Sequence, residues 1–403
     1  MKNRFRKCLP VVVAVLLLWL NQSFLGGSIN DRNVVVGLGI DYKAEEYLVT
    51  AEIVVTESVG ADGNSAAAKI LSGRGKTVAD ALQDIYKQTA RVPSLGQCCI
   101  LLLGEGLFTS QDVVQALGYF AYSDNFKDGT IVACCIGTAQ DFYAQNNLPD
   151  EYVSIGLQTL LSSSSAHTAT PGVILHTFIE SMRSRGGGGY LPLVKHLAES
   201  GETSSEDAAK ATASQAGSAA EEGEENKTSG AYVCKRAALF RGGKYCGTLS
   251  ERATKGYVLL NDEASFENFV MEDRFGEVPF SDLVTVGVLS KKTETVASYE
   301  TTPAFVLRMR VRFRRMRTDM AANTVTSMPK LEPELGPDLL EGMRGELEAL
   351  LQACVEESVA FGCDLFQTYE ALYRAAGRKW EFFEDRADAL SGIDFRIEVE
   401  VSE

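Results

Sequence analysis

The sequence lacks the familiar arrangements of catalytic residues. It contains three histidines, no Gly-x-Ser-x-Gly motif, no metal-binding pair at helical spacing and no cysteine with an ordered histidine partner. It also lacks an excess of positive charge, because the formal net charge is −15. An acidic balance of this size argues against general nucleic-acid binding. We therefore expect a protein that is not an enzyme, holds no metal or cofactor and does not bind nucleic acid.

The cysteines do not form the even, regularly spaced set that is typical of a disulfide framework. There are nine, and four of them form two adjacent pairs, Cys98-Cys99 and Cys134-Cys135, inside strand-like apolar runs. Adjacent residues of a strand point to opposite faces of its sheet, which argues against a two-cysteine metal site in either pair. We expect these thiols to be small side chains of the core.

The three histidines, His167, His176 and His196, lie in one stretch of the chain. A metal site or an acid–base cluster there is the alternative to a structural role, since histidine titrates near neutrality. Their spacings do not match the ligand pattern of a helix face, so the sequence favours the structural role. Two other functions stay open: a secreted or membrane-tethered hydrolase with an unrecognised site, and a ligand-binding module that acts alone.

The first 28 residues have the pattern of an export signal or a membrane anchor. Four cations within residues 2–7 precede an apolar run at 9–20, and small residues follow it. The run is shorter than the ~20 apolar residues of a comfortable transmembrane helix. The basic head is expected to stay in the cytoplasm, which places the chain after residue 30 outside the membrane.

The same segment lacks the cysteine of a bacterial lipoprotein. Such proteins carry a Leu-x-Gly-Cys box after the apolar run, whereas this sequence reads Leu-Gly-Gly-Ser at residues 25–28. Ser28 has no thiol with which to form the thioether, so lipidation at this position is excluded. The segment is expected either to stay uncleaved as an anchor, which we favour, or to be cut near Ser28.

Apolar runs of strand length alternate with amphipathic stretches in the first half of the chain. Strands are predicted at residues 34–41, 47–55, 97–103 and 129–136, and helices at 78–91 and 110–122, the second capped by Ser110. Residues 72–77 are expected to form a turn into the first helix, because their glycines are too closely spaced for a phosphate-binding loop. The alternation predicts an α+β fold with mixed sheets, each packed with helices.

The composition divides the chain into parts. Residues 198–230 are rich in Glu, Ser, Ala, Gly and Thr and have no apolar residue larger than Ala, which predicts a disordered acidic linker. We expect an N-terminal α/β domain at 29–197, a small β-rich middle domain at 231–285 and a C-terminal α/β domain at 286–403. A run of four glycines at 186–189 is expected to be a flexible turn.

One predicted strand, at residues 305–317, carries arginines at alternate positions, namely Arg308, Arg310, Arg312 and Arg314. A period of two places all four on one face of a sheet. They are either an interaction face for anionic lipid or an acidic partner, or members of cross-strand ion pairs. The last strand, 395–401, alternates in the same way with Glu398 and Glu400. We favour ion pairing between the two strands.

The C-terminal region combines a long helix with an ordered set of residues. Pro337 opens the helix and Gly362 ends it, and a shorter helix is predicted at 363–374. Within and after that helix the sequence reads Asp364-x-Phe366, Glu370-Ala-Leu-Tyr-Arg374 and then Trp380. An ordinary helix pair explains the apolar positions of this region but not the whole ordered set.

These motifs resemble the Ger(x)C family, the C subunits of bacterial spore germinant receptors. The resemblance includes Ser-Ile-Asn-Asp-Arg at 28–32, Gly-x-Gly-Ile-Asp at 37–41, Ser-Gly-x-Gly-Lys-Thr at 72–77, Leu-Gly at 95–96 and the C-terminal set. The family has Cys and Trp where this chain has Ser28 and Ile29. The resemblance implies a non-enzymatic protein with three α/β regions, needed for nutrient-triggered germination. It also implies a place on the outer face of the spore inner membrane, beside membrane-embedded A and B subunits.

Overall fold

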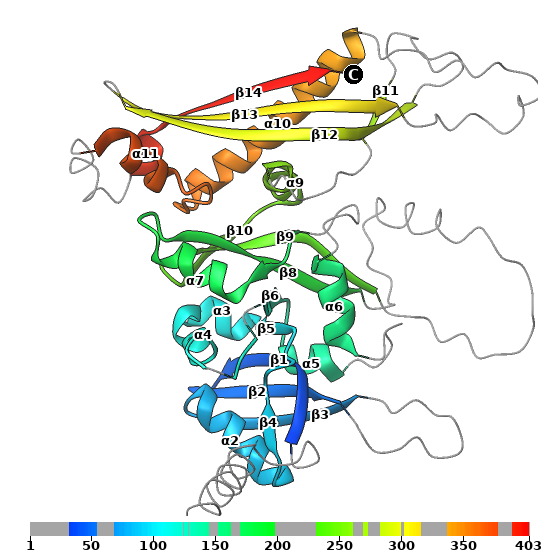
Figure 1. The fold of residues 1–403 in the computed structure, drawn as a ribbon, viewed down its shortest axis with the longest axis vertical. Helices are drawn as coiled ribbons and strands as arrows, with labels where there is room; N and C mark the ends of the chain where they lie inside the picture. Colours follow the sequence, from blue (N-terminus) through cyan, green and yellow to red (C-terminus); the bar gives the residue numbers. More distant parts are fainter. Residues whose placement is uncertain are drawn as a thin grey trace, which may run out of the picture.

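The computed structural model describes residues 32–54, 68–123, 125–127, 129–144, 152–162, 170–197, 231–260, 269–272, 283–299, 302–315, 337–377 and 389–402. The predicted α+β class is confirmed, because helices cover two mixed sheets (Figure 1). The first sheet has the order β10-β9-β8-β6-β5-β1-β2-β3, with β4 on β1 and β7 on β6. Its strands are β1 (Arg32–Lys43), β2 (Glu46–Ile53), β3 (Lys69–Gly75), β4 (Val92–Ser94), β5 (Ile100–Gly104), β6 (Ile131–Cys135), β7 (Val173–Ile174), β8 (Gly188–Leu197), β9 (Ala231–Arg241) and β10 (Lys244–Thr248).

The centre of this sheet is buried on both faces, as parallel strands require. Strands β5 and β6 pair in parallel and every residue in them is buried. Cys98 and Cys134 belong to one core cluster, whereas Cys99 and Cys135 belong to the cluster on the other face. The prediction that the adjacent cysteines are core side chains on opposite faces is therefore confirmed.

Helices α2 (Val78–Thr89), α3 (Glu105–Ser110), α4 (Val113–Ala121), α5 (Ala139–Ala144), α6 (Val153–Ser162) and α7 (Leu175–Arg183) accompany the first sheet. Two sequence predictions about them are wrong. Residues 72–75 belong to β3, which pairs with β2 along its whole length, and only Thr77 serves as the cap of α2. Ser110 lies inside α3 and bonds to Gly106 O, while the Asp112 carboxylate caps α4 by accepting from Val114 N.

The chain returns to the first sheet after residues 198–230, the predicted acidic linker, which lies outside the described residues. Strand β9 pairs antiparallel with β8, and β10 pairs antiparallel with β9. The first ten strands thus form one hydrogen-bonded sheet although the predicted boundary between 197 and 231 crosses it. The division into domains at 29–197, 231–285 and 286–403 stays a prediction.

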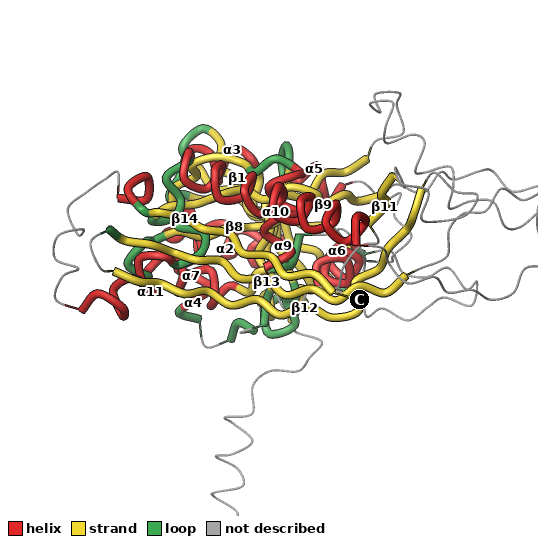
Figure 2. Tube along the Cα trace, turned by 90° about the horizontal axis from the view of Figure 1, so that it is seen from above, coloured by secondary structure: helices red, strands yellow, loops and turns green. Residues whose placement is uncertain are grey.

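The second sheet consists of β11 (Phe269–Glu272), β12 (Leu283–Tyr299), β13 (Pro303–Arg315) and β14 (Asp394–Ser402). Strands β12, β13 and β14 run side by side across one end of the molecule (Figure 2). Helix α10 (Pro337–Ala360) packs on one face of this sheet against Met309, Val311 and Phe313. Helix α9 (Glu251–Leu260) lies between the two sheets, and α11 (Thr368–Ala376) contacts β12 (Figure 1).

Candidate functional site

The histidines do not form a common site among the residues that the structure describes. His176 lies on α7 with its exposed Nε2 3.0 Å from Oε1 of Glu180. His196 lies on β8 with its ring edge-on to Phe142, and burial lowers its pKa. His167 lies outside the described residues. Within the described ranges, no group of three or more His, Cys, Asp or Glu side chains is placed to hold a metal ion.

Arg308, Arg310 and Arg312 alternate along β13 with the apolar residues that pack against α10, so they lie on the opposite face of the second sheet. Strands β13 and β14 pair in parallel, with Arg308 opposite Glu398 and Arg310 opposite Glu400. The Nε atoms of the two arginines lie 2.6 and 2.7 Å from Oε2 of their glutamates. The hydrogen bond that Arg308 donates to Glu398 raises the pKa of Arg308. Pairing between these two strands, which the alternating charges predict, is therefore confirmed.

The other two predicted arginines have different surroundings. Arg312 Nε donates to Ser290 Oγ on β12 at 3.0 Å. Arg314 lies opposite Gly287 in the β12–β13 ladder, and its side chain lies outside the described part of the structure. We call the row formed by Arg308, Glu398, Arg310 and Glu400 the charge ladder. Its role as an interaction face stays a prediction.

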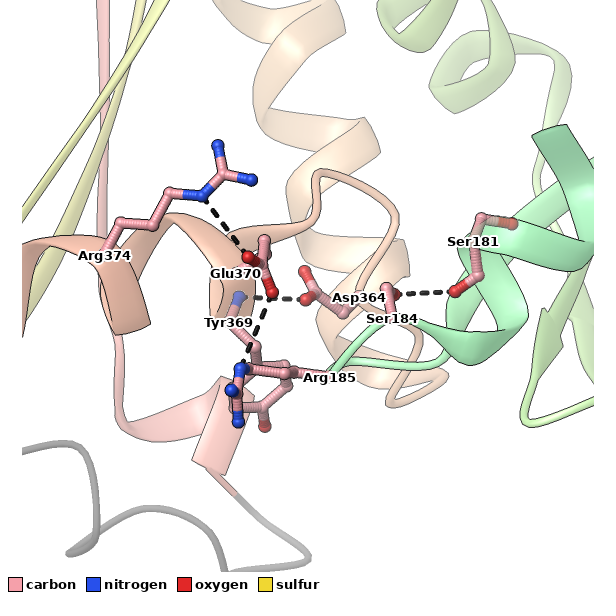
Figure 3. A network of polar contacts seen from close by, with 7 residues as sticks. All are labelled: Ser181, Ser184, Arg185, Asp364, Tyr369, Glu370 and Arg374. Carbon is pink, nitrogen blue, oxygen red and sulfur yellow. Dashed lines mark hydrogen bonds and ion pairs between the residues drawn. The ribbon is translucent and has the colours of Figure 1, made fainter. Parts of the chain in front are cut away.

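A network of polar contacts joins two described segments that lie far apart in the chain. The turn between α7 and β8, at residues 184–187, meets the segment between α10 and α11 (Figure 3). The buried carboxylate of Asp364 accepts hydrogen bonds from Thr368 N at 2.7 Å and Tyr369 N at 3.0 Å, and so caps α11. A Cβ atom on Gly186 would lie 2.2 Å from Oδ2 of Asp364. The glycine run, predicted as a flexible turn, thus permits close contact with Asp364.

Charged side chains surround this junction. Arg185 Nε lies 3.6 Å from Oε2 of Glu370, whose other oxygen lies 3.3 Å from Nε of Arg374 (Figure 3). The Arg185 guanidinium also stacks over the ring of Tyr373, 3.5 Å from its centroid. Asp364, Glu370 and Arg374 belong to the ordered set that the sequence singled out. Asp364 and Glu370 contact the turn that precedes β8, whereas Arg374 pairs with Glu370 inside α11.

Two thiols meet beside the same junction. Cys363 Sγ, which is buried, lies 3.3 Å from Phe240 O on β9 and hydrogen bonds to the thiol of Cys246 on β10. This bond lowers the pKa of the half-buried Cys246, and together with burial it raises that of Cys363. No sequence pattern indicates that these two residues are close together.

Two buried carboxylates in the first sheet were given no role by sequence reasoning, although one of them ends the Gly-x-Gly-Ile-Asp motif at 37–41. Asp41 accepts from Ala139 N and Gln140 N at the start of α5, and Glu52 accepts from Val153 N and Ser154 N at the start of α6. Burial raises the pKa of both groups. An acidic residue inside a buried strand was the available signal, since such a group needs hydrogen-bond donors. Each carboxylate is satisfied by backbone amides, which supports a structural role.

Comparisons with known proteins cover nearly the whole described chain. Residues 28–196 match the family model described as spore germination protein N-terminal domain. Residues 235–402 match the model described as spore germination B3/GerAC like, C-terminal. No curated protein matches the sequence. A solved structure, the crystal structure of the GerBC protein, is 15% identical with a TM-score of 0.46 and covers 91% of this chain and 97% of its own.

Proposed function

Since two successive models match most of its length, this chain belongs to the family of GerAC-like spore germination proteins, and we propose that it is a non-enzymatic subunit of a spore germinant receptor. The main support for the proposal is that both family models match, with the N-terminal model before the C-terminal one. The junction around Asp364 supports it, because residues of the family's C-terminal motif attach α11 to the part of the chain that the N-terminal model covers.

We propose that the protein lies on the outer face of the spore inner membrane, tethered by residues 1–28. In the described part of the chain no helix is long and apolar enough to cross a membrane. The apolar run at 9–20 lies outside that part and is the proposed anchor. Ser28 excludes the lipid anchor that the family pattern would otherwise supply at this position. The intact mass of the membrane-bound protein tests the anchor: an added diacylglycerol, or a chain that starts near residue 29, would contradict it.

The proposed partners are the membrane-embedded A and B subunits of the same receptor, and the membrane surface itself. The structure offers two surfaces for them, at opposite ends of its long axis (Figure 1). One is the second sheet with its charge ladder. The other is the end at which β1 begins, which residues 21–31 connect to the proposed anchor.

Germination of spores that lack this gene tests the receptor function. We expect such spores to keep their refractility in nutrient mixtures and to respond normally to a non-nutrient trigger that bypasses the receptors. Normal germination by both routes, in a strain without related receptors, would overturn the proposal.

Complementation with histidine variants tests the hydrolase alternative in the same strain. A receptor subunit should tolerate His167→Ala and His176→Ala, since His176 is an exposed side chain on α7. Loss of complementation by either variant, with normal protein levels in the spore, would favour a catalytic site.

A further inference from the structure

A cleft of about 720 Å³ lies beside the first described residue of the chain. It is bounded by the start of β1 with β4 on one side, and by α4 with the turn that follows it on the other. Its lining includes Arg32, Val92, Pro93, Tyr119 and Lys127. Apart from Arg32, which belongs to the family resemblance, none of these residues belongs to a motif discussed above.

The charge of this cleft is opposite to that of the chain. Arg32 and Lys127 are its charged lining residues, both are exposed, and neither has an ion-pair partner within the described ranges. The whole chain, in contrast, has a formal net charge of −15. Asp124 and Asp128, which flank Lys127 in the sequence, lie outside the described residues. Two exposed cations at one cleft of an acidic protein are suited to an anionic ligand.

The rim of the cleft is apolar and aromatic. Val92 is 55% exposed and Tyr119 is 41% exposed, and Pro93, the middle residue of β4, also lines the cleft. Tyrosine combines an apolar ring with a polar tip, and it is enriched where protein meets the lipid–water interface. Cations beside exposed apolar groups are the side chains that bind anionic lipid surfaces.

The position of the cleft indicates which anionic ligand it binds. Strand β4 pairs with the start of β1 at Arg32, and both lie at one end of the long axis, with the second sheet at the other end (Figure 1). The proposed anchor at 9–20 is connected to Arg32 through residues 21–31, whose greatest extension is roughly 40 Å. The cleft is therefore held near the bilayer surface.

We infer that this cleft binds the head groups of anionic phospholipids, so that the end of the molecule that carries β4 rests on the membrane and the second sheet points away from it. The inference rests on the proposed function, because it needs the N-terminal segment to hold the chain on a bilayer. Arg32 and Lys127 bind the phosphate, and Val92 and Tyr119 contact the interfacial region. The charge ladder at the opposite end is then available to a protein partner rather than to lipid.

Photo-cross-linking of the full chain tests this orientation. The protein is reconstituted through its N-terminal segment in vesicles of phosphatidylcholine, alone or mixed with phosphatidylglycerol, with photoreactive benzoylphenylalanine in place of Val92. The matched control carries the same group in place of Leu289 on β12, which is also 55% exposed. We expect lipid adducts by mass spectrometry from position 92, several-fold more with phosphatidylglycerol, and only background from position 289.

Charge variants test the role of the two cations. Arg32→Gln and Lys127→Gln should each lower the phosphatidylglycerol adduct at position 92, by roughly fivefold for each cation lost, without changing vesicle flotation. Equal adducts at both positions, or a preference for phosphatidylglycerol that survives both substitutions, would overturn the inference. A chain that fails to float with vesicles would overturn the tether and this inference together. Spore germination tests the receptor function separately, because it does not depend on which lipid the cleft contacts.

Discussion

The carboxylate of Asp364 occupies the space into which a side chain at Gly186 would project. A Cβ atom there would lie 2.2 Å from Oδ2, well inside van der Waals contact. Asp364 is only 2% exposed and is fixed by two amides of α11, so it has little freedom to move aside. The turn after α7 and the segment before α11 are therefore fitted to each other at this point.

We expect Gly186→Ala to lower the free energy of unfolding by about 1–3 kcal/mol, the usual cost of inserting a methyl group into a filled site. The matched control is Gly345→Ala, in the middle of α10, where nothing lies within 4 Å of the new methyl group. Because alanine favours a helix interior over glycine, this variant should gain roughly 0.5–1 kcal/mol. Urea unfolding of the three proteins measures both changes. Equal stability of Gly186→Ala and the parent would contradict the fit described here.

Local periodicity predicted most elements of the fold, and long-range contacts account for the errors. The apolar run at residues 34–41 and the helical spacing of apolar residues after Pro337 depend only on residues that are close in the sequence. Strand β1 and helix α10 were therefore predicted correctly. The start of α4 was not. Both Ser110 and Asp112 are able to cap a helix, and the choice is made by Gly243 O in the β9–β10 turn, which accepts from Val113 N at 2.9 Å.

The pKa of Asp364 predicts a pH dependence of stability. Burial raises this pKa above its ordinary value of 3.8, although the two amide bonds act to lower it. The folded state therefore binds the proton more tightly than the unfolded state does. This contribution to stability is complete at low pH and is lost as the pH rises through the raised pKa.

Asp364→Asn removes this titration. We expect the free energy of unfolding of the parent, relative to Asp364→Asn, to fall as the pH rises from about 4, by at most about 1.4 kcal/mol per pH unit. Urea unfolding of both proteins over a series of pH values gives this difference. A difference that grows with pH would mean that the amide bonds to the carboxylate outweigh its burial.

The thiol pair at the junction predicts selective alkylation. The bond from Cys363 lowers the pKa of Cys246, whereas burial raises the pKa of Cys98, Cys99, Cys134, Cys135, Cys234 and Cys354. Because the thiolate is the nucleophile, Cys246 should react first with iodoacetamide among the described cysteines of the native protein. Peptide mass mapping identifies the modified residue and separates it from Cys8, which lies outside the described residues.

Removal of the donor provides the control for this effect. Cys363→Ala should raise the pKa of Cys246, so alkylation of Cys246 at neutral pH becomes slower. At a pH above the pKa of Cys246 in both the parent and the variant, the alkylation rate should be the same in the two proteins. Cys354→Ala, a buried thiol of the same core cluster, should leave the rate at Cys246 unaltered. Equal slowing by both variants would mean that packing, rather than the thiol–thiol bond, activates Cys246.

The candidate sites show the limit of sequence reasoning more clearly than the fold does. The pairing of β13 with β14 was predictable, because arginine occupies alternate positions of one strand and glutamate alternate positions of the other. The contact of Asp364 with Gly186 was not, since it joins segments far apart in the chain and leaves no periodic pattern in either. The same holds for Cys246 with Cys363, and for Arg32 with Lys127, which line one cleft although they lie far apart in the chain.

The charge ladder allows its two interpretations to be separated by a charge swap. Arg310 and Glu400 face each other across β13 and β14 with exposed fractions of 64% and 70%. Arg310→Glu places two negative charges opposite each other, and Glu400→Arg places two positive charges there. Each single variant should lower the free energy of unfolding by less than about 1 kcal/mol, because the pair is so exposed. The double variant restores an attractive pair with its direction reversed. If pairing is the role of these residues, the double variant recovers both the unfolding midpoint and nutrient-triggered germination in complemented spores, which is the result we expect. If a partner instead binds each charge at its original position, the double variant regains its stability but spores complemented with it do not germinate in nutrient. The charge ladder is then an interaction face.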